Sequence, residues 1–135
     1  MATFISLLAS SSRSDFMFDT DADTSDGWKI SIQGRSIKDA DFLHTALSSF
    51  LKDASIPFKV GTAKRINSLN KVQSRKVMTI YCPNNIDINS LAEQVYQLTF
   101  EYKGWYDIPT PSSYSHYAGG LFIRNDRVNG QYVPC

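Results

Sequence analysis

Cysteine is scarce in this sequence, and its scarcity excludes two classes of small protein. Only Cys82 and Cys135 occur among the 135 residues. They are too few and too far apart for a disulfide framework or a zinc site. We therefore expect free thiols in a cytoplasmic protein, with no metal and no other cofactor. Long apolar runs are lacking too, so no segment has the length needed to cross a bilayer, and we expect no membrane partner.

Net charge is also small, at +1, which argues against a nucleic-acid partner. The charges are nevertheless unevenly distributed. The segment between Arg13 and Lys29 carries an acidic run without a basic residue: Asp15, Asp19, Asp21, Asp23 and Asp26. Residues 54–86 carry a basic block without an acidic residue: Lys59, Lys64, Arg65, Lys71, Arg75 and Lys76. Either both runs are solvated surface and tail, or the block binds an anion that the acidic arm can replace.

The hydrophobic pattern predicts one α+β domain over residues 27–135, preceded by a flexible acidic leader over residues 1–26. Within that leader only the apolar FISLL could pair as an edge strand. Residues 28–33, WKISIQ, alternate apolar and polar side chains, which is typical of a half-buried strand. Shorter strands are predicted at PFKVG, KVMTIYCP and LFIRN, and the chain between residues 103 and 120 is predicted to be a long loop.

Two main helices are expected between these strands. The first follows Ser36 and places Leu43, Leu47 and Leu51 on one face. The second covers DINSLAEQVYQLTFEY, with Ser90 and Glu93 as a capping box. AKRINSLN could add one or two helical turns. This succession predicts a small mixed or antiparallel sheet covered on one face by the two helices.

The order GWKISIQG, capped helix, PFKVG, RKVMTIYCP, helix and YSHYAGGLFI, over residues 27–124, resembles a known family. It is similar to the N-terminal lyase domain of class III and class IV lanthipeptide synthetases. That domain is similar in turn to the phosphothreonine lyase effectors of pathogenic bacteria. The resemblance implies β-elimination of phosphate from phosphoserine or phosphothreonine in a peptide.

The resemblance also implies roles for particular residues. Lys59 matches the family's lysine base, which must be neutral when it removes the α-proton. Tyr81 lies on the same side of its strand as Thr79 and could donate a hydrogen bond. The predicted phosphate-binding residues are Lys29, Lys64, Arg65, Arg75 and Lys76. From pattern alone, an ordinary outward-facing strand residue is the favoured interpretation of Lys59, and aromatic core packing is as good an interpretation of Tyr81 as a role in the site.

One position departs from the family pattern. Ser31, two residues after Lys29, stands where the family has the histidine acid. A serine hydroxyl is too weak an acid to replace imidazolium, and a missing general acid costs about 10²- to 10⁴-fold in rate. Two histidines are candidate substitutes. His44 lies beside the apolar stripe of the first helix, where a structural role is favoured, whereas His116 lies in the Tyr-rich loop and is the better candidate for the site.

Two functions follow from these patterns. The first is a lyase-like domain that binds a phosphorylated peptide and eliminates phosphate, with a separate kinase and cyclase as possible partners. The second is a module that has lost catalysis and binds another protein as an adaptor, an inhibitor, or an immunity or anti-defence protein. Ser31 favours the second function. Lys59 and the basic block favour the first, or at least retained anion binding.

Overall fold

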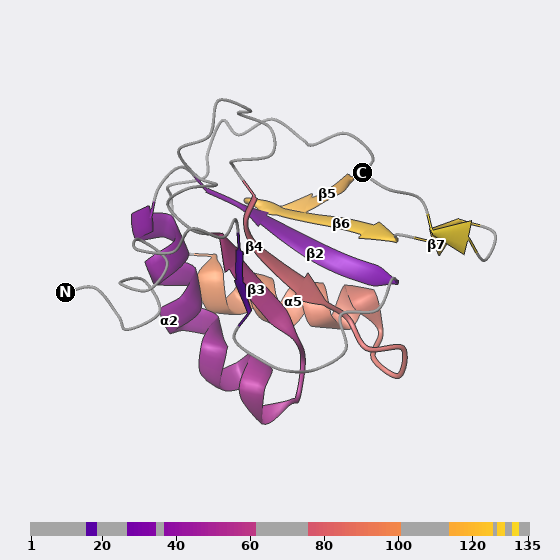
Figure 1. Cartoon of the computed structure of the whole chain (residues 1–135), viewed down its shortest axis with the longest axis horizontal. Helices are drawn as coiled ribbons and strands as arrows, with labels where there is room; N and C mark the ends of the chain where they lie inside the picture. Colours follow the sequence, from indigo (N-terminus) through magenta and orange to yellow (C-terminus); the bar gives the residue numbers. More distant parts are fainter. Residues whose placement is uncertain are drawn as a thin grey trace.

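The computed structural model describes residues 16–18, 27–34, 37–61, 76–100, 114–125, 127–128 and 131–132. These residues form two helices and eight strands (Figure 1). Six strands build the main sheet in the order β1-β3-β4-β2-β6-β5, and every neighbouring pair is antiparallel. Their bounds are Phe16–Phe18 (β1), Trp28–Gln33 (β2), Phe58–Gly61 (β3), Lys76–Tyr81 (β4), Ser115–Ala118 (β5) and Leu121–Asn125 (β6). A separate two-stranded ribbon pairs Arg127–Val128 (β7) with Gln131–Tyr132 (β8).

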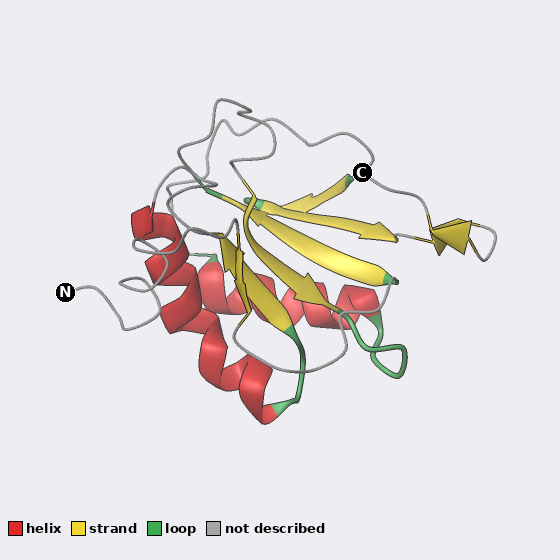
Figure 2. Cartoon of the chain, in the orientation of Figure 1, coloured by secondary structure: helices red, strands yellow, loops and turns green. Residues whose placement is uncertain are grey.

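Both helices, Ile37–Asp53 (α2) and Ile88–Thr99 (α5), pack on the same side of the sheet (Figure 2). Helix α2 buries Leu43, Leu47 and Leu51, which recur every four residues and so share one face. The predicted α+β class, with an antiparallel sheet covered by two helices, is confirmed. Neither helix in the described part of the chain is long and apolar enough to cross a membrane.

Alternation along the strands gives the sheet two chemically different faces. Ile30 and Ile32 of β2 are fully buried in the hydrophobic core under the helices. Residues Lys29, Ser31 and Gln33 therefore project to the opposite face. The same alternation puts Thr79 and Tyr81 on that opposite face, while Ile80 belongs to the core. We call the sheet face away from the helices the polar face.

The structure corrects the predicted chain organisation at two edges of the sheet. Residues 115–118, expected to lie in a long loop, form strand β5 and pair with β6. Residues 16–18, expected to lie in the flexible leader, form strand β1 and pair with β3. Period-two patterns of three or four residues are too short to distinguish such strands from loops. The FISLL segment and the aspartates after β1 lie outside the described residues, as does AKRINSLN.

The start of α5 also differs from the prediction. Asp87 is the N-cap, and its Oδ2 accepts a hydrogen bond from the Ser90 backbone N–H at 2.9 Å. The predicted capping box at Ser90 and Glu93 is therefore wrong by one turn. Asp87 fits the N-cap because its carboxylate satisfies an N–H that has no partner within the helix.

Glu93 instead connects α5 to β5. Its carboxylate accepts hydrogen bonds from the Tyr117 hydroxyl at 2.5 Å and from the Gln97 amide at 2.7 Å. The hydrogen bond from Gln97, followed by that from Tyr117, lowers the pKa of Glu93. The hydrogen bond to Glu93 is the main cause that raises the pKa of Tyr117. This contact fixes β5, and with it one edge of the polar face, against the helical layer.

The Tyr117–Glu93 contact predicts a pH-dependent difference between the wild type and Tyr117→Phe. Because the folded pKa of Glu93 is lowered, its contribution is present above the ordinary carboxylate range and is lost as pH falls through the folded value. Because the folded pKa of Tyr117 is raised, the contribution of this hydrogen bond to the free energy of unfolding is also lost at high pH, as the pH rises through the folded pKa of Tyr117. The calorimetric unfolding midpoints of the wild type and Tyr117→Phe should therefore differ slightly near neutral pH. They should converge at low and at high pH. A difference that is constant with pH contradicts this account.

Candidate anion-binding site

Strand register places one row of polar-face residues across the sheet. The row runs through paired Cα positions in the order Phe18, Lys59, Thr79, Ser31, Phe122 and His116. Neighbouring strands lie about 4.8 Å apart, so the backbones of Lys59 and Ser31 are separated by roughly 10 Å, with Thr79 between them. Residues far apart in sequence thus share one line on the polar face.

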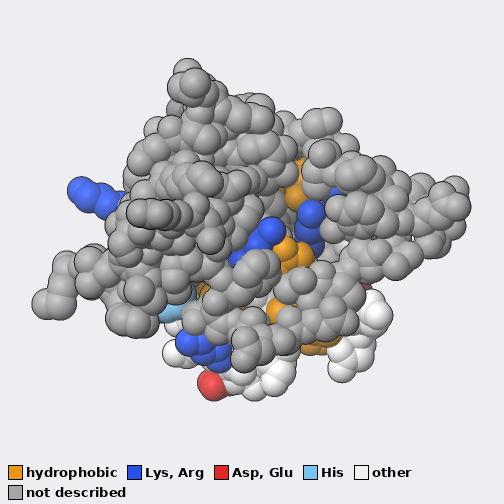
Figure 3. All heavy atoms as spheres, viewed as in Figure 1, with side chains coloured by type: hydrophobic (Ala, Val, Ile, Leu, Met, Phe, Trp, Pro, Cys, Tyr) orange, Lys and Arg blue, Asp and Glu red, His pale blue; other side chains and the backbone are white. Residues whose placement is uncertain are grey.

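A second row lies two residues along the strands and therefore on the same face. Lys29 of β2 pairs with Tyr81 of β4 on one side and with Arg124 of β6 on the other. The two rows together place three cationic side chains, Lys29, Lys59 and Arg124, on the polar face. In the view of Figure 3, Lys and Arg side chains lie near the centre of the molecule beside hydrophobic ones. Three neighbouring cations produce a field that favours an anionic ligand.

Aromatic rings hold two of these cations. The Lys29 Nζ lies 5.9 Å from the centroid of the Tyr114 ring, and the Lys59 Nζ lies 5.7 Å from the centroid of the Tyr81 ring. Both distances are within the range of cation–π attraction. Lys29, Lys59 and Tyr81 are partly exposed. An anion in solvent can therefore reach this part of the polar face.

The remaining polar side chains of this face are covered. Ser31 is 0%, Gln33 1%, and Thr79 and Arg124 each 5% exposed. The Ser31 hydroxyl oxygen and the Gln33 amide nitrogen have no hydrogen-bond partner. An unsatisfied buried polar group costs about 1–3 kcal/mol of stability. Each such group calls for an explanation, and an ordered water or a bound ligand that supplies the missing partner is one.

The predicted site residues have different outcomes. Lys29, Lys59 and Tyr81 lie together on the polar face, as described above. His116 is in the same row as Ser31 but on the edge strand, where it is exposed. Three of the predicted phosphate ligands, Lys64, Arg65 and Arg75, lie outside the described residues. Lys76 is the first residue of β4, and its side chain is not among those described.

His116 is engaged by its own hairpin. Its Nε2 donates to the Gly119 carbonyl oxygen at 2.8 Å, and its ring centroid lies 5.0 Å from that of Phe122. Phe122 separates it from Ser31 in the row, so a role as substitute acid stays a prediction. His44 is half-buried, and its ring centroid lies 6.3 Å from that of Phe58. Phe58 belongs to the core under the helices, so His44 is remote from the polar face.

Arg124 and Thr79 are candidate site residues that the sequence reasoning missed. The sequence places Arg124 in the predicted strand LFIRN, but the family resemblance assigns it no role in the site. The signal was nonetheless present, because alternation from the buried Leu121 places Phe122 and Arg124 on the face opposite to Leu121. Thr79 was used only to orient Tyr81. Its position between Lys59 and Ser31 depends on strand order, which the sequence does not show.

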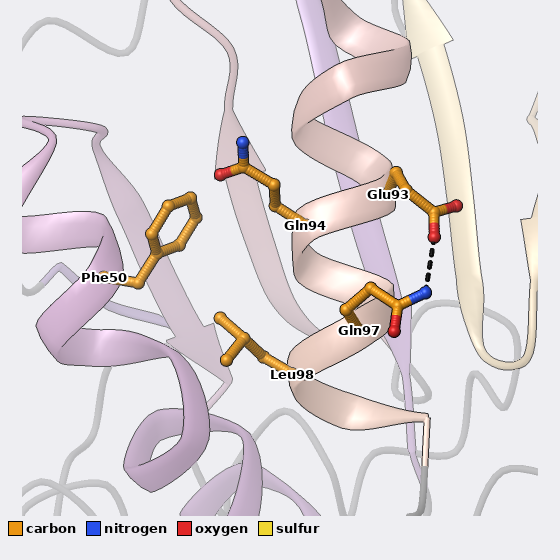
Figure 4. Close-up of a pocket in the computed structure, with 5 residues that line it drawn as sticks. All are labelled: Phe50, Glu93, Gln94, Gln97 and Leu98. Atoms are coloured by element: carbon orange, nitrogen blue, oxygen red, sulfur yellow. Dashed lines mark hydrogen bonds between the residues drawn. The ribbon is translucent and has the colours of Figure 1, made fainter.

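A shallow groove of about 330 Å³ lies on the other layer of the molecule, between α2 and α5. Its lining residues are Phe50, Glu93, Gln94, Gln97 and Leu98 (Figure 4). Glu93 is the only charged side chain among them, which makes the groove unsuited to a phosphate. The groove and the cationic residues therefore lie on different sides of the sheet. For an anionic ligand, the polar face with its cations is the better match. Among the described residues, no cluster of His, Cys, Asp and Glu could hold a metal ion.

Comparison with known proteins supports the fold. No family model matches the sequence, and no curated protein matches it. Among solved structures, the chain is similar to the type III effector and phosphothreonine lyase OspF from Shigella flexneri, with a TM-score of 0.58 and 16% sequence identity. The similarity covers 84% of this chain and 66% of the effector chain. At this identity the chain shares the fold of a phosphothreonine lyase. The finer resemblance to lanthipeptide synthetase domains stays a prediction.

Proposed function

We propose that this domain binds a phosphorylated peptide on the polar face of its sheet and does not itself eliminate the phosphate efficiently. The observation that carries the proposal is that Lys29, Lys59 and Arg124 all project from the polar face, Lys59 in the row of Ser31 and the other two in the adjoining row. Arginine can hold phosphate through two parallel hydrogen bonds, and lysine supplies a compact charge. The phosphothreonine lyase fold supports phosphothreonine or phosphoserine as the ligand group.

The domain is expected to eliminate phosphate poorly because position 31 holds a serine instead of a general acid. If Lys59 removes the α-proton, the leaving phosphate needs a proton donor on the same face. Ser31 is directly in the row of Lys59, but its hydroxyl cannot donate a proton as an imidazolium does. The domain would then act as a binding module, as an adaptor or inhibitor for a phosphorylated protein. The second candidate, slow elimination in cooperation with a separate kinase and cyclase, is favoured only by the retained Lys59.

Titration with matched peptides tests the proposal. A peptide containing phosphothreonine should bind, and its affinity should fall as salt concentration rises, because the contacts are ionic. The same peptide without phosphate should bind at least 10-fold more weakly, since a charge-assisted hydrogen bond contributes about 1.5–3 kcal/mol. Mass spectrometry of the incubated phosphopeptide should show no loss of phosphoric acid. Equal affinity for the two peptides contradicts phosphate recognition, and rapid loss of phosphoric acid favours the lyase.

A further inference from the structure

Gln33 ends the polar face of β2, two positions beyond Ser31. Its backbone N–H donates to the Gly120 carbonyl oxygen at 2.9 Å, so the strand itself is held in place. Its side chain is 1% exposed, and the amide nitrogen has no partner. The register with β4 shifts between Ile32 and Gln33. Such bulges redirect side chains and often occur beside functional sites.

Spacing along β2 separates Gln33 from the cationic residues. At about 3.3 Å per residue, its Cα lies roughly 7 Å from that of Ser31 and roughly 13 Å from that of Lys29. Lys29, Ser31 and Gln33 form a column along the polar face of β2, and one phosphate group is too small to contact both Lys29 and Gln33. A ligand that contacts both Lys29 and Gln33 must extend along β2, over the length of about four residues of an extended peptide.

The chemistry of the Gln33 side chain fits such a ligand. A primary amide offers both donors and an acceptor, and a peptide group offers one of each. An amide is uncharged, so it contributes less than Lys29 or Arg124 to the capture of a phosphate dianion. Ser31, with its own unpartnered hydroxyl, lies between the cationic end of the column and Gln33.

We propose that a bound peptide enters the covered part of the polar face, where its main chain hydrogen-bonds Gln33 next to the phosphorylated residue, so that the site selects an extended phosphopeptide over free phosphate. This inference rests on the proposed function, because it assigns Gln33 to the same polar face. A glutamine with a purely structural role should pair its amide within the fold. An unpaired buried amide costs stability, and functional sites often carry such a cost.

Gln33→Leu tests this inference, because leucine fills a similar volume without the amide. The variant should bind the phosphothreonine peptide about 10-fold more weakly, the effect of about one lost hydrogen bond. Its affinity for inorganic phosphate, measured by competition, should stay within about twofold of the wild type. Its unfolding midpoint should rise by a few degrees, because an unsatisfied group has been removed. Lys29→Met should instead weaken the binding of both the phosphothreonine peptide and inorganic phosphate.

Two further variants complete the experiment. Gln94→Leu makes the same change on the exposed face of α5, and it should alter neither affinity. Gln33→Met removes the amide with a flexible side chain, in case leucine does not fit. The role of Gln33 is overturned if folded Gln33 variants bind the peptide as tightly as the wild type does. It is also overturned if their affinities for the peptide and for inorganic phosphate fall equally. In both cases the proposed function stands. Failure of the wild type to distinguish the phosphorylated from the unphosphorylated peptide overturns both.

Discussion

Ser31→His should give the domain a measurable phosphothreonine elimination activity, about 10²- to 10⁴-fold above the wild type. Position 31 lies on the polar face, in one row with Lys59 and beside Lys29 and Arg124. In the restored reaction Lys59 takes the α-proton, a double bond forms between Cα and Cβ, and the Cβ–O bond breaks. The imidazolium at position 31 protonates the departing phosphate. Mass spectrometry of the phosphopeptide should show the loss of phosphoric acid.

Two controls separate acid catalysis from a general effect of the larger side chain. Ser31→Asn places a polar group at the same position but cannot supply a proton, so it should leave elimination at the wild-type level. Adding Lys59→Met to Ser31→His should abolish the new activity because the base is removed. If folded Ser31→His binds the phosphopeptide but eliminates nothing, the assignment of position 31 to the acid is wrong.

Lys59→Met should weaken binding of the phosphothreonine peptide by about 10- to 100-fold, the effect of losing one charge-assisted contact. Methionine keeps most of the apolar stem of lysine, and Lys59 is only partly buried, so the unfolding midpoint should change little. The dependence of affinity on salt should also become weaker, since one ionic contact is gone. Titration calorimetry at several salt concentrations measures both effects.

Lys52→Met is the matched control for this prediction. Lys52 is an exposed residue in the last turn of α2, and this helix packs on the opposite face of the sheet. Its removal changes the net charge of the chain by the same amount but should leave the phosphopeptide affinity within about twofold of the wild type. Equal weakening by Lys52→Met and Lys59→Met would mean that only net charge matters, and it would contradict a localised anion site.

The sequence predicted the parts of the fold whose hydrophobic patterns are long. Strand β2 was predicted at its observed bounds, because three apolar residues alternate with three polar ones over WKISIQ. Helix α2 was recognised from leucines that recur every four residues. The helix at residues 88–99 was recognised too, although its cap was placed one turn late because both Asp87 and Ser90 are good N-cap residues.

The composition of the candidate site was harder to predict, because it depends on contacts between distant strands. Lys59, Thr79, Ser31 and Phe122 form one row only because the strands follow the order β3-β4-β2-β6. The family resemblance identified Lys59 and Ser31, and alternation placed Tyr81 beside Thr79. Alternation along LFIRN placed Arg124 on the side opposite to Leu121, but it did not show that this side is the one that carries Lys59 and Ser31. The roles of Lys64, Arg65, Arg75 and Lys76 in phosphate binding stay predictions.

Nuclear magnetic resonance provides the most direct test of the claim that phosphate binds among Lys29, Lys59 and Arg124. Titrating the isotope-labelled protein with the phosphothreonine peptide should shift the side-chain signals of these three residues together and saturate at one common affinity. The groove residues Phe50 and Leu98 on the helical layer should stay unchanged. Shifts confined to that groove, with the three cations unaffected, would place the ligand elsewhere and contradict the account.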